Sequence, residues 1–288
     1  GHFSDHILPD KIHSINVCFQ VNHMQEKFGG TAGNIAYALK MMGEEPFISA
    51  CIGQDYQRYF SWLEKNGISI EGIKIINDEF TAGAFITTDK ADNQITGFNS
   101  GAMQYSSSLD FDRIDTEKTI MIISPGNLED MVNYPRICKQ KEIEYIFDPG
   151  QSLPVLDKNN LIAAVTGCKA LVCNDYEIEL LMNKMNMDEG VLLERADAVI
   201  VTMGELGSRV YTQDGEIRIS AAKPRQVVDP TGAGDAYRGG LLSGLLHGKD
   251  IEECARMGSA CASFAVECYG TQCYSFTQDE FKERLSTL

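Results

Sequence analysis

With 288 residues, the chain is too long for a minimal domain and too short for two full-sized ones, so we expect one large domain with a smaller appendage. Its formal net charge of -16 opposes binding to DNA, RNA or an anionic membrane surface, and its hydrophobic fraction of 43% can build a core without metals or crosslinks. No apolar run has the length of a membrane span and no basic leader opens the chain, so the sequence predicts a soluble cytoplasmic protein.

The first hundred residues are predicted to be rich in strands. Apolar residues alternate early in the chain, and polar turns separate short apolar runs further on. In chain order we expect a strand over 12–21, a helix that begins near Asn34 and ends at Gly43, a buried strand over 46–52, a helix over 56–65 and several short strands over 68–99.

Beyond residue 117 the pattern changes to a regular alternation of strands and helices. This alternation is typical of a parallel sheet with crossover helices, whose ligands bind beyond the carboxyl ends of the strands. We expect strands over 119–124, 145–148, 170–174 and 198–202, helices from about 128, near 160 and from 175, a hairpin-like pair over 208–220, and long helices over 234–247 and 251–267.

The nine cysteines are an odd number, none lies in a Cys-x-x-Cys pair, and a chain of this length needs no disulfide framework. Cys254, Cys261 and Cys268 recur every seven residues, which places them on one face of the last expected helix. Heptad spacing separates the thiols by about 10 Å along the helix axis, too far to share a metal ion. We therefore expect small buried thiols that pack in the core.

The most informative stretch is residues 229–236, Asp-Pro-Thr-Gly-Ala-Gly-Asp-Ala, which precedes a long helical pattern. Gly232, Ala233 and Gly234 let the backbone pass close to a ligand. The helix that begins here directs unpaired N–H groups and its positive dipole end at the same place. The stretch therefore predicts an anion hole that would stabilise a phosphoryl group during transfer.

Asp235 lies in the first turn of that helix, where a carboxylate either caps the helix or faces a reacting hydroxyl. The helix cap is the plainer interpretation of an isolated Gly-x-Gly-Asp. The chain has neither a Gly-x4-Gly-Lys-Ser/Thr phosphate loop nor a Gly-x-Gly-x-x-Gly turn after its first strand, so a phosphate would need this other architecture.

Residues 229–236 resemble the second signature of the ribokinase family of sugar and nucleoside kinases, also called the phosphofructokinase B type. The first signature has a match in residues 29–34, Gly-Gly-Thr-Ala-Gly-Asn, with Gly43 and Gly53 at the following glycine positions. An ordinary helix entry capped by Thr31 is the alternative for this stretch alone. Two signatures far apart in the chain, in the family's order, are hard to obtain by chance.

The resemblance implies a ribokinase-like α/β fold, a three-layer α/β/α sandwich with a mostly parallel central sheet and a small β-rich lid. It implies a single kinase domain over 1–288, with lid strands drawn from about 12–28 and 68–105 and a nucleotide-binding core over about 117–288. Family members normally begin with a core strand that ends in a sugar-binding aspartate. Nothing before residue 12 has that pattern, so the chain either lacks this strand or begins inside a normal family member.

The resemblance also assigns roles to individual residues. Asp235 becomes the catalytic base, Gly232, Ala233 and Gly234 form the anion hole, and ATP with magnesium is the implied phosphoryl donor. The residues implied to bind the acceptor or the nucleotide are Gly29, Gly30 and Asn34 for the sugar, whose hydroxyls suit an amide, and Asn174, Thr202, Gly204, Gly207, Ala262 and Gly270 for ATP.

Cation binding is implied at two places. Glu177, in the family's Asn-x-x-Glu element, would organise magnesium indirectly, although Asn174 could simply cap the next helix. Asp229 and Thr231 match positions that border a monovalent cation site, so potassium activation is left open. The turn over 202–207 could likewise be an ordinary tight turn.

Several stretches, including 28–37 and 85–89, look like the bacterial type of adenosine kinase, which implies phosphorylation of the adenosine 5′-hydroxyl in purine salvage. Phe19, Phe28, Phe85 and Phe98 could supply an apolar slot for the base or could be lid core. Two alternatives remain: a kinase for a free sugar such as ribose, fructose or a keto-deoxy acid, and an inactive nucleoside-binding protein. The oligomeric state is left open, because the lid strands could pair with a partner.

Overall fold

The computed structural model describes residues 2, 3, 7, 10, 14, 16–18, 20–91 and 93–288. Its largest sheet has six strands in the order β10-β9-β8-β7-β6-β5. Strands β5 to β8 are parallel, and β9 and β10 are antiparallel. The mostly parallel sheet confirms the prediction from the strand and helix alternation. The strands are β5 (Ile120–Ile123), β6 (Glu144–Phe147), β7 (Ala170–Asn174), β8 (Val199–Thr202), β9 (Ser208–Thr212) and β10 (Gly215–Ile219).

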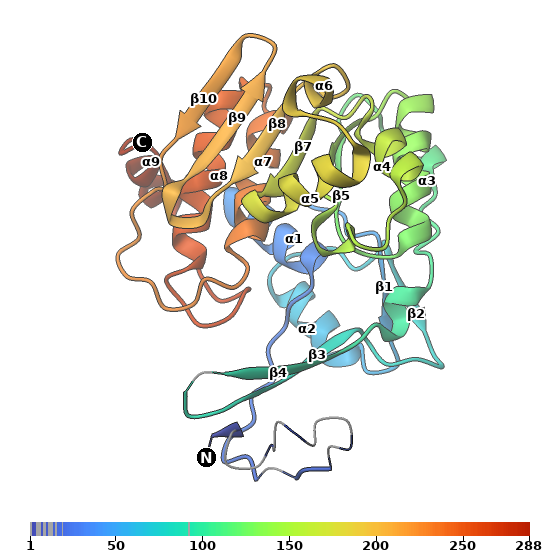
Figure 1. Cartoon of the computed structure of the whole chain (residues 1–288), viewed down its shortest axis with the longest axis vertical. Helices are drawn as coiled ribbons and strands as arrows, with labels where there is room; N and C mark the ends of the chain where they lie inside the picture. The colour runs from blue at the N-terminus through green and yellow to red at the C-terminus, as the bar shows by residue number, and fades with distance from the viewer. Residues whose placement is uncertain are drawn as a thin grey trace.

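Helices pack on both faces of this sheet (Figure 1). Strand β7 is buried on both sides, because Leu171 and Cys173 join one core cluster whereas Ala170 and Val172 join another. The first cluster includes residues of α3 to α6, and the second includes residues of α1, α7 and α8. This arrangement is the expected three-layer sandwich. The helices are α1 (Thr31–Met42), α3 (Leu128–Gln140), α4 (Lys158–Val165), α5 (Asp175–Met185), α6 (Glu189–Leu193), α7 (Ala233–Leu246) and α8 (Ile251–Ala265).

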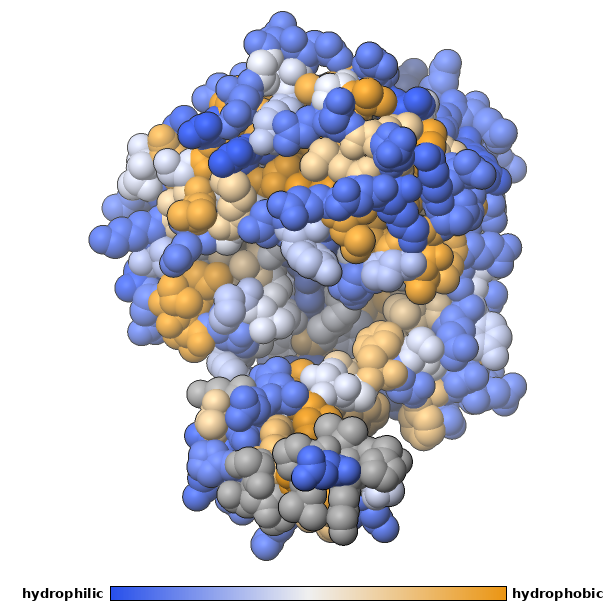
Figure 2. Space-filling model, viewed as in Figure 1, coloured by the Kyte–Doolittle hydropathy of each residue, from blue (hydrophilic) through white to orange (hydrophobic). Residues whose placement is uncertain are grey.

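Two small sheets lie outside the central one, and three of their strands, β2 to β4, fall within residues 68–99, where short strands are expected. Strands β1 (Ala50–Gly53) and β2 (Ile73–Ile76) are parallel, and β3 (Gly83–Thr88) and β4 (Gln94–Asn99) form an antiparallel hairpin. The hairpin projects from the body near α2 (Gln57–Lys65) (Figure 1). The space-filling view is hollowed between the body and the part that carries the hairpin (Figure 2).

Two strand predictions near the N-terminus need correction. Residues 12, 13, 15 and 19 lie outside the described residues, and residues 16–18 and 20–28 form no strand. Apart from the half-buried Phe28, these described residues are exposed, so their apolar alternation has no core to bury against. The strand expected over 46–52 begins only at Ala50, since Pro46 has no N–H group to donate and Phe47 forms just an isolated bridge.

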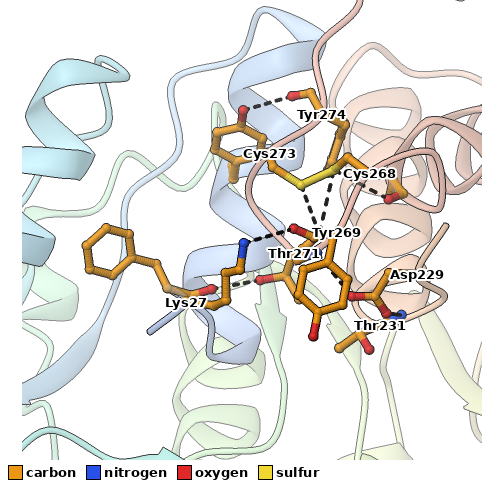
Figure 3. Close-up of a disulfide and its surroundings, with 12 residues drawn as sticks. Lys27, Asp229, Thr231, Cys268, Tyr269, Thr271, Cys273 and Tyr274 are labelled. Atoms are coloured by element: carbon orange, nitrogen blue, oxygen red, sulfur yellow. Dashed lines mark hydrogen bonds between the residues drawn. A yellow bond between two sulfur atoms is a disulfide. The ribbon is translucent and has the colours of Figure 1, made fainter. Parts of the chain in front are cut away.

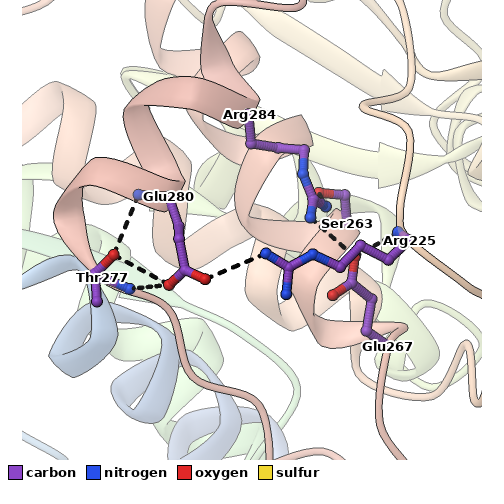
Figure 4. A network of polar contacts seen from close by, with 6 residues as sticks. All are labelled: Arg225, Ser263, Glu267, Thr277, Glu280 and Arg284. Atoms are coloured by element: carbon purple, nitrogen blue, oxygen red, sulfur yellow. Dashed lines mark hydrogen bonds and ion pairs between the residues drawn. The ribbon is translucent and has the colours of Figure 1, made fainter.

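Helix α9 (Gln278–Leu285) was not expected, although its capping box is readable in the sequence. Thr277 accepts a hydrogen bond from the backbone N–H of Glu280, whose carboxylate accepts from the N–H of Thr277. Arg225 donates to Glu280, and Arg284 donates to Ser263 of α8 (Figure 4). These contacts join α9 to α8 and to the segment before α7.

The prediction for the cysteines is half right. Cys254 and Cys261 are fully buried in α8, but that helix ends at Ala265 and Cys268 lies in the loop beyond it. Cys268 forms a disulfide with Cys273, which corrects the expectation that Cys268 is a free thiol packed in the core. Within the described part of the chain, none of the helices is both long and apolar enough to cross a bilayer.

Candidate active site

The turn before α7 has the backbone shape that the glycine pattern predicted. Gly232 is the N-cap residue of α7 and has a φ of 81°. A Cβ atom at Gly232 would lie 2.8 Å from Thr271 Cγ2, so only glycine fits. The N–H of Ala233 donates to the carbonyl oxygen of Pro230, and the N–H of Ala236 donates to that of Gly232. The N–H groups of Gly234 and Asp235 have no backbone acceptor in the part of the chain that the structure describes, so these two, and not that of Ala233, are the free donors at the positive end of α7.

Asp235 does not cap α7. Its Oδ2 accepts a hydrogen bond of 2.7 Å from Asn34 Nδ2, which lies on α1. Burial raises the pKa of Asp235; the hydrogen bond from Asn34 and the charge of Arg238 oppose this shift, and the negative charge of Asp148 adds to it. The result is a carboxylate that binds a proton more readily than an exposed one.

The structure does not contain the alternative in which Thr31 caps α1. Gly30, with a φ of 86°, is the N-cap residue of α1, so Thr31 is the first helical residue and not the cap. Asn34 is 6% exposed and is brought to Asp235 by the packing of α1 against α7. A Cβ atom on Gly239 of α7 would lie 2.4 Å from the Cβ of Ala38, so small residues allow this close approach.

A buried ion pair between Arg238 and Asp148 supports the start of α7, and no motif in the sequence indicates it. Arg238 is 7% exposed and Asp148, which follows β6, is 2% exposed. Arg238 Nη2 donates to Asp148 Oδ1 at 2.8 Å, and Nε lies 2.5 Å from Oδ2. Arg238 Nη1 also donates to the carbonyl oxygen of Gly234. The only signal in the sequence is an arginine three residues after Asp235 within a run of small and apolar residues.

The loop after α8 closes over the turn at Asp229 (Figure 3). Asp229 Oδ1 accepts from the N–H of Thr231 and Oδ2 accepts from the N–H of Gly270. Partial burial raises the pKa of Asp229, but a hydrogen bond from the Thr231 side chain, these two N–H groups and the charge of Lys27 together lower the pKa below its ordinary value. Thr271 Oγ1 donates to the carbonyl oxygen of Phe28, so this loop joins the turn before α7 to the entry of α1.

Asn174 and Thr202 lie side by side at the carboxyl ends of β7 and β8, where the parallel pairing places them in register. Asn174 is the N-cap residue of α5 and forms a capping box with Glu177. Asn174 therefore caps the helix that follows it, which is the alternative interpretation of this residue. Burial raises the pKa of Glu177, opposed by the hydrogen bond from the Asn174 N–H.

The turn over Gly204–Leu206 follows β8 as a 3-10 helix. Gly207 has a φ of 89°, and a Cβ atom there would lie 2.0 Å from the carbonyl oxygen of Ile219. An ordinary tight turn is therefore enough to explain why residue 207 is glycine. Gly204, with a φ of 57°, has open space around it.

The remaining predicted residues lie in different surroundings. Gly270 contacts Asp229, whereas Ala262 is a partly buried member of α8 that packs against the second core cluster. Phe85 lies on β3 with 70% of its surface exposed, so the structure does not bring it to Asp235. The aromatic rings beside the entry of α1 are instead Phe28, Tyr59 and Trp62, with ring centroids 5.0 Å and 5.8 Å from that of Phe28.

Comparison with known proteins identifies the family. Residues 3–277 match the family model described as pfkB family carbohydrate kinase. A nucleoside kinase of Methanocaldococcus jannaschii is 36% identical over 278 residues, which are 96% of this chain and 91% of the relative. A ribokinase of Bacillus subtilis is 26% identical over 263 residues, 90% of this chain and 87% of the relative.

Solved structures agree with this assignment. Burkholderia thailandensis nucleoside kinase in complex with inosine has a TM-score of 0.88 at 36% identity, with 100% of this chain and 92% of that chain covered. The M. jannaschii nucleoside kinase structure has a TM-score of 0.85 at 36% identity, with coverage of 96% and 92%. The expected ribokinase-like fold is thereby confirmed. The chain belongs to the PfkB family of carbohydrate kinases and is a phosphotransferase that acts on a hydroxyl acceptor.

Proposed function

We propose that this enzyme transfers the γ-phosphoryl group of ATP to the 5′-hydroxyl of a purine nucleoside, with adenosine as the first expected acceptor. The observation that carries the proposal is the contact between Asn34 and Asp235 at the start of α7. It joins an amide suited to ribose hydroxyls with a carboxylate suited to proton abstraction. The M. jannaschii and B. thailandensis relatives, both 36% identical, are named nucleoside kinases.

In this proposal Asp235 accepts the proton of the acceptor hydroxyl while the N–H groups of Gly234 and Asp235 stabilise the phosphoryl group in transfer. The raised pKa of Asp235 makes its carboxylate a stronger base than an exposed aspartate. Arg238 holds the Gly234 carbonyl and so fixes the backbone on which these donors lie. Gly29 and Gly30 leave room for the sugar beside Asn34.

ATP would lie along Asn174, Thr202 and the turn that follows β8. Among the described residues, no group of three or more His, Cys, Asp or Glu side chains could hold a metal ion. Magnesium would therefore be held mainly by phosphates and water, with Glu177 acting indirectly, which is the usual mode for this ion. Both carboxylate oxygens of Asp229 already accept N–H groups, so potassium would need carbonyl oxygens around Asp229 and Thr231.

The base of the nucleoside needs an apolar surface, and Phe28, Tyr59 and Trp62 offer one beside the entry of α1. Phe85 could reach the base only after movement of the β3–β4 hairpin, which would also shield the reaction from water. The inosine complex of the B. thailandensis enzyme favours a site that accepts more than one purine base. A kinase for free ribose is the second candidate, because the B. subtilis relative is named ribokinase.

The deciding experiment measures ADP release with adenosine, inosine, cytidine, ribose and fructose as acceptors. We expect kcat/KM for adenosine or inosine to exceed that for either sugar by at least about tenfold, the scale of a few lost contacts. Turnover of a sugar without turnover of nucleosides would make the protein a sugar kinase. Thermal stabilisation by adenosine without ADP release would instead indicate nucleoside binding alone.

A further inference from the structure

Gln272 is a buried glutamine on the loop after α8, with 5% of its surface exposed. Its Oε1 accepts a hydrogen bond of 3.0 Å from Trp62 Nε1. Its Nε2 donates to Asn34 Oδ1 at 3.0 Å and to the Tyr59 hydroxyl at 3.1 Å. Asn34 Nδ2 in turn donates to Asp235 Oδ2. The side chains of Trp62, Gln272 and Asn34 thus form a continuous relay that ends on the carboxylate.

The indole of Trp62 fixes the direction of the whole relay. An indole N–H can only donate, so the amide oxygen of Gln272 must face Trp62 and its NH2 group must face Asn34. The oxygen of Asn34 then faces Gln272, and its NH2 group faces Asp235. A reversed Asn34 amide would place its oxygen against the carboxylate, which is a contact between two acceptors.

The absence of a side chain at Gly33 leaves room for the relay. A Cβ atom at Gly33 would lie 2.0 Å from the Tyr59 hydroxyl and 3.1 Å from Gln272 Nε2, so the glycine of the first signature makes room for these side chains. Phe28 covers the indole, with ring centroids 5.8 Å apart. Enclosed polar groups of this kind are costly to leave unpaired, which holds the relay in one arrangement.

We propose that Gln272 is a positioning residue that, through Asn34, aims the carboxylate of Asp235 at the acceptor hydroxyl. This inference rests on the proposed role of Asp235 as the base. The relay occupies Oδ2 of Asp235, which leaves Oδ1 to receive the proton of the hydroxyl.

The groups that face Asp235 come from several elements. Arg238 lies on α7, Asp148 follows β6, and the Tyr274 phenol lies on the loop after α8. Burial raises the pKa of Asp235, and the hydrogen bond from Asn34 is the strongest influence that opposes it, ahead of the charge of Arg238. Release of Asn34 should therefore raise the pKa of Asp235 further.

The test replaces Gln272 with methionine, which has a similar length and no hydrogen-bond donor. In protein labelled with [13C]aspartate, the carboxyl signal of Asp235 is identified by its loss in Asp235→Asn. We expect Gln272→Met to raise the pKa of Asp235 by about one unit, the scale of a hydrogen bond to a charged group. The matched control is Gln278→Met, which removes a hydrogen bond to the Met42 carbonyl in the same C-terminal segment.

Steady-state kinetics give the second readout. We expect kcat of Gln272→Met to fall by about tenfold or more, the acid limb of its pH profile to move to higher pH, and KM for ATP to stay unchanged. Trp62→Phe keeps the ring but frees the Gln272 amide to reverse, so it should shift both readouts in the same direction. If Gln272→Met does not fold, the same two measurements on Trp62→Phe test the proposal.

A pKa and a kcat in both variants equal to those of Gln278→Met would overturn the proposal. A raised pKa with unchanged kcat would also overturn it, since the relay would then hold the carboxylate without aiming it. The carboxyl titration needs no substrate. It therefore tests the relay even if the wild-type chain phosphorylates no nucleoside. That second result would contradict the proposed function and would say nothing against the relay.

Discussion

Asn34 and Asp235 lie 201 residues apart in the chain, yet Asn34 Nδ2 donates to Asp235 Oδ2 across 2.7 Å. The contact joins the two glycine-rich motifs that carry the family resemblance, because one begins α1 and the other begins α7. Both helices present their N-terminal turns to the same place. An acceptor held by the first motif would therefore meet a phosphoryl group held by the second.

Replacement of Asp235 by asparagine tests its role as the base. The variant keeps the size of the side chain, and its amide oxygen can still accept the hydrogen bond from Asn34. We expect kcat to fall by at least about a hundredfold, the scale of a general base, with nucleoside affinity largely kept. Turnover is measured by ADP release and binding by calorimetry. Near-normal kcat, matching the Asp279→Asn control on α9, would remove Asp235 from the mechanism.

The same variant should be more stable than the wild type at neutral pH. The folded pKa of Asp235 is raised above its ordinary value of 3.8, so the folded state binds the proton more tightly than the unfolded chain. Stability then falls as pH rises from 3.8 through the folded pKa, and the full cost of the buried charge is present above that range. Asp235→Asn has no such cost.

Denaturant unfolding of the wild type and of Asp235→Asn at a series of pH values checks this prediction. The stability advantage of the variant should be largest at pH 7 and should vanish once the pH is well below 3.8. An advantage that does not change with pH would assign the difference to packing and not to the titration of Asp235.

The sequence predicted the central sheet well because β7 and β8 are buried on both faces and so form short apolar runs. It also predicted the turn at Gly232, because a backbone shape that favours glycine is visible in the residue type. It could not find Gln272, because a lone glutamine in a loop has no pattern. Its role depends on Trp62 and Asn34, which only the folded chain brings to it.

Gly232 and Gly248, on either side of α7, both have positive φ angles, so one serves as the control for the other. Gly232 has a φ of 81° and faces Thr271, whereas Gly248 has a φ of 65° and has no atom within 4 Å of its would-be Cβ. Alanine at Gly248 should cost only the backbone strain of about 1–2 kcal/mol. Alanine at Gly232 should lower the free energy of unfolding by more, because its Cβ also collides with Thr271, and it should reduce kcat. Equal losses of stability with kcat intact would mean that the turn adapts to the new side chain.

The Arg238–Asp148 pair should matter far more to stability than an exposed pair. Arg238→Met leaves the carboxylate of Asp148 buried without its partner, so we expect a loss of about 3–5 kcal/mol in the free energy of unfolding. Arg218, whose side chain is 75% exposed beside Glu216, is the control, and Arg218→Met should change stability by less than about 1 kcal/mol. Denaturant unfolding measures both. A second change, Asp148→Asn, should recover part of the loss in Arg238→Met, and a further loss would contradict the ion-pair explanation.

The disulfide between Cys268 and Cys273 should stabilise the loop that carries Gln272. It closes a short loop, with a sequence separation of 5, so Cys273→Ser should lower the free energy of unfolding by about 2 kcal/mol at most. A reducing agent should lower the stability of the wild type by the same amount and should leave Cys273→Ser unchanged. The exposed Cys18, which is free, serves as the control through Cys18→Ser. If the reducing agent destabilises Cys273→Ser as much as the wild type, the effect comes from another cysteine and not from this crosslink.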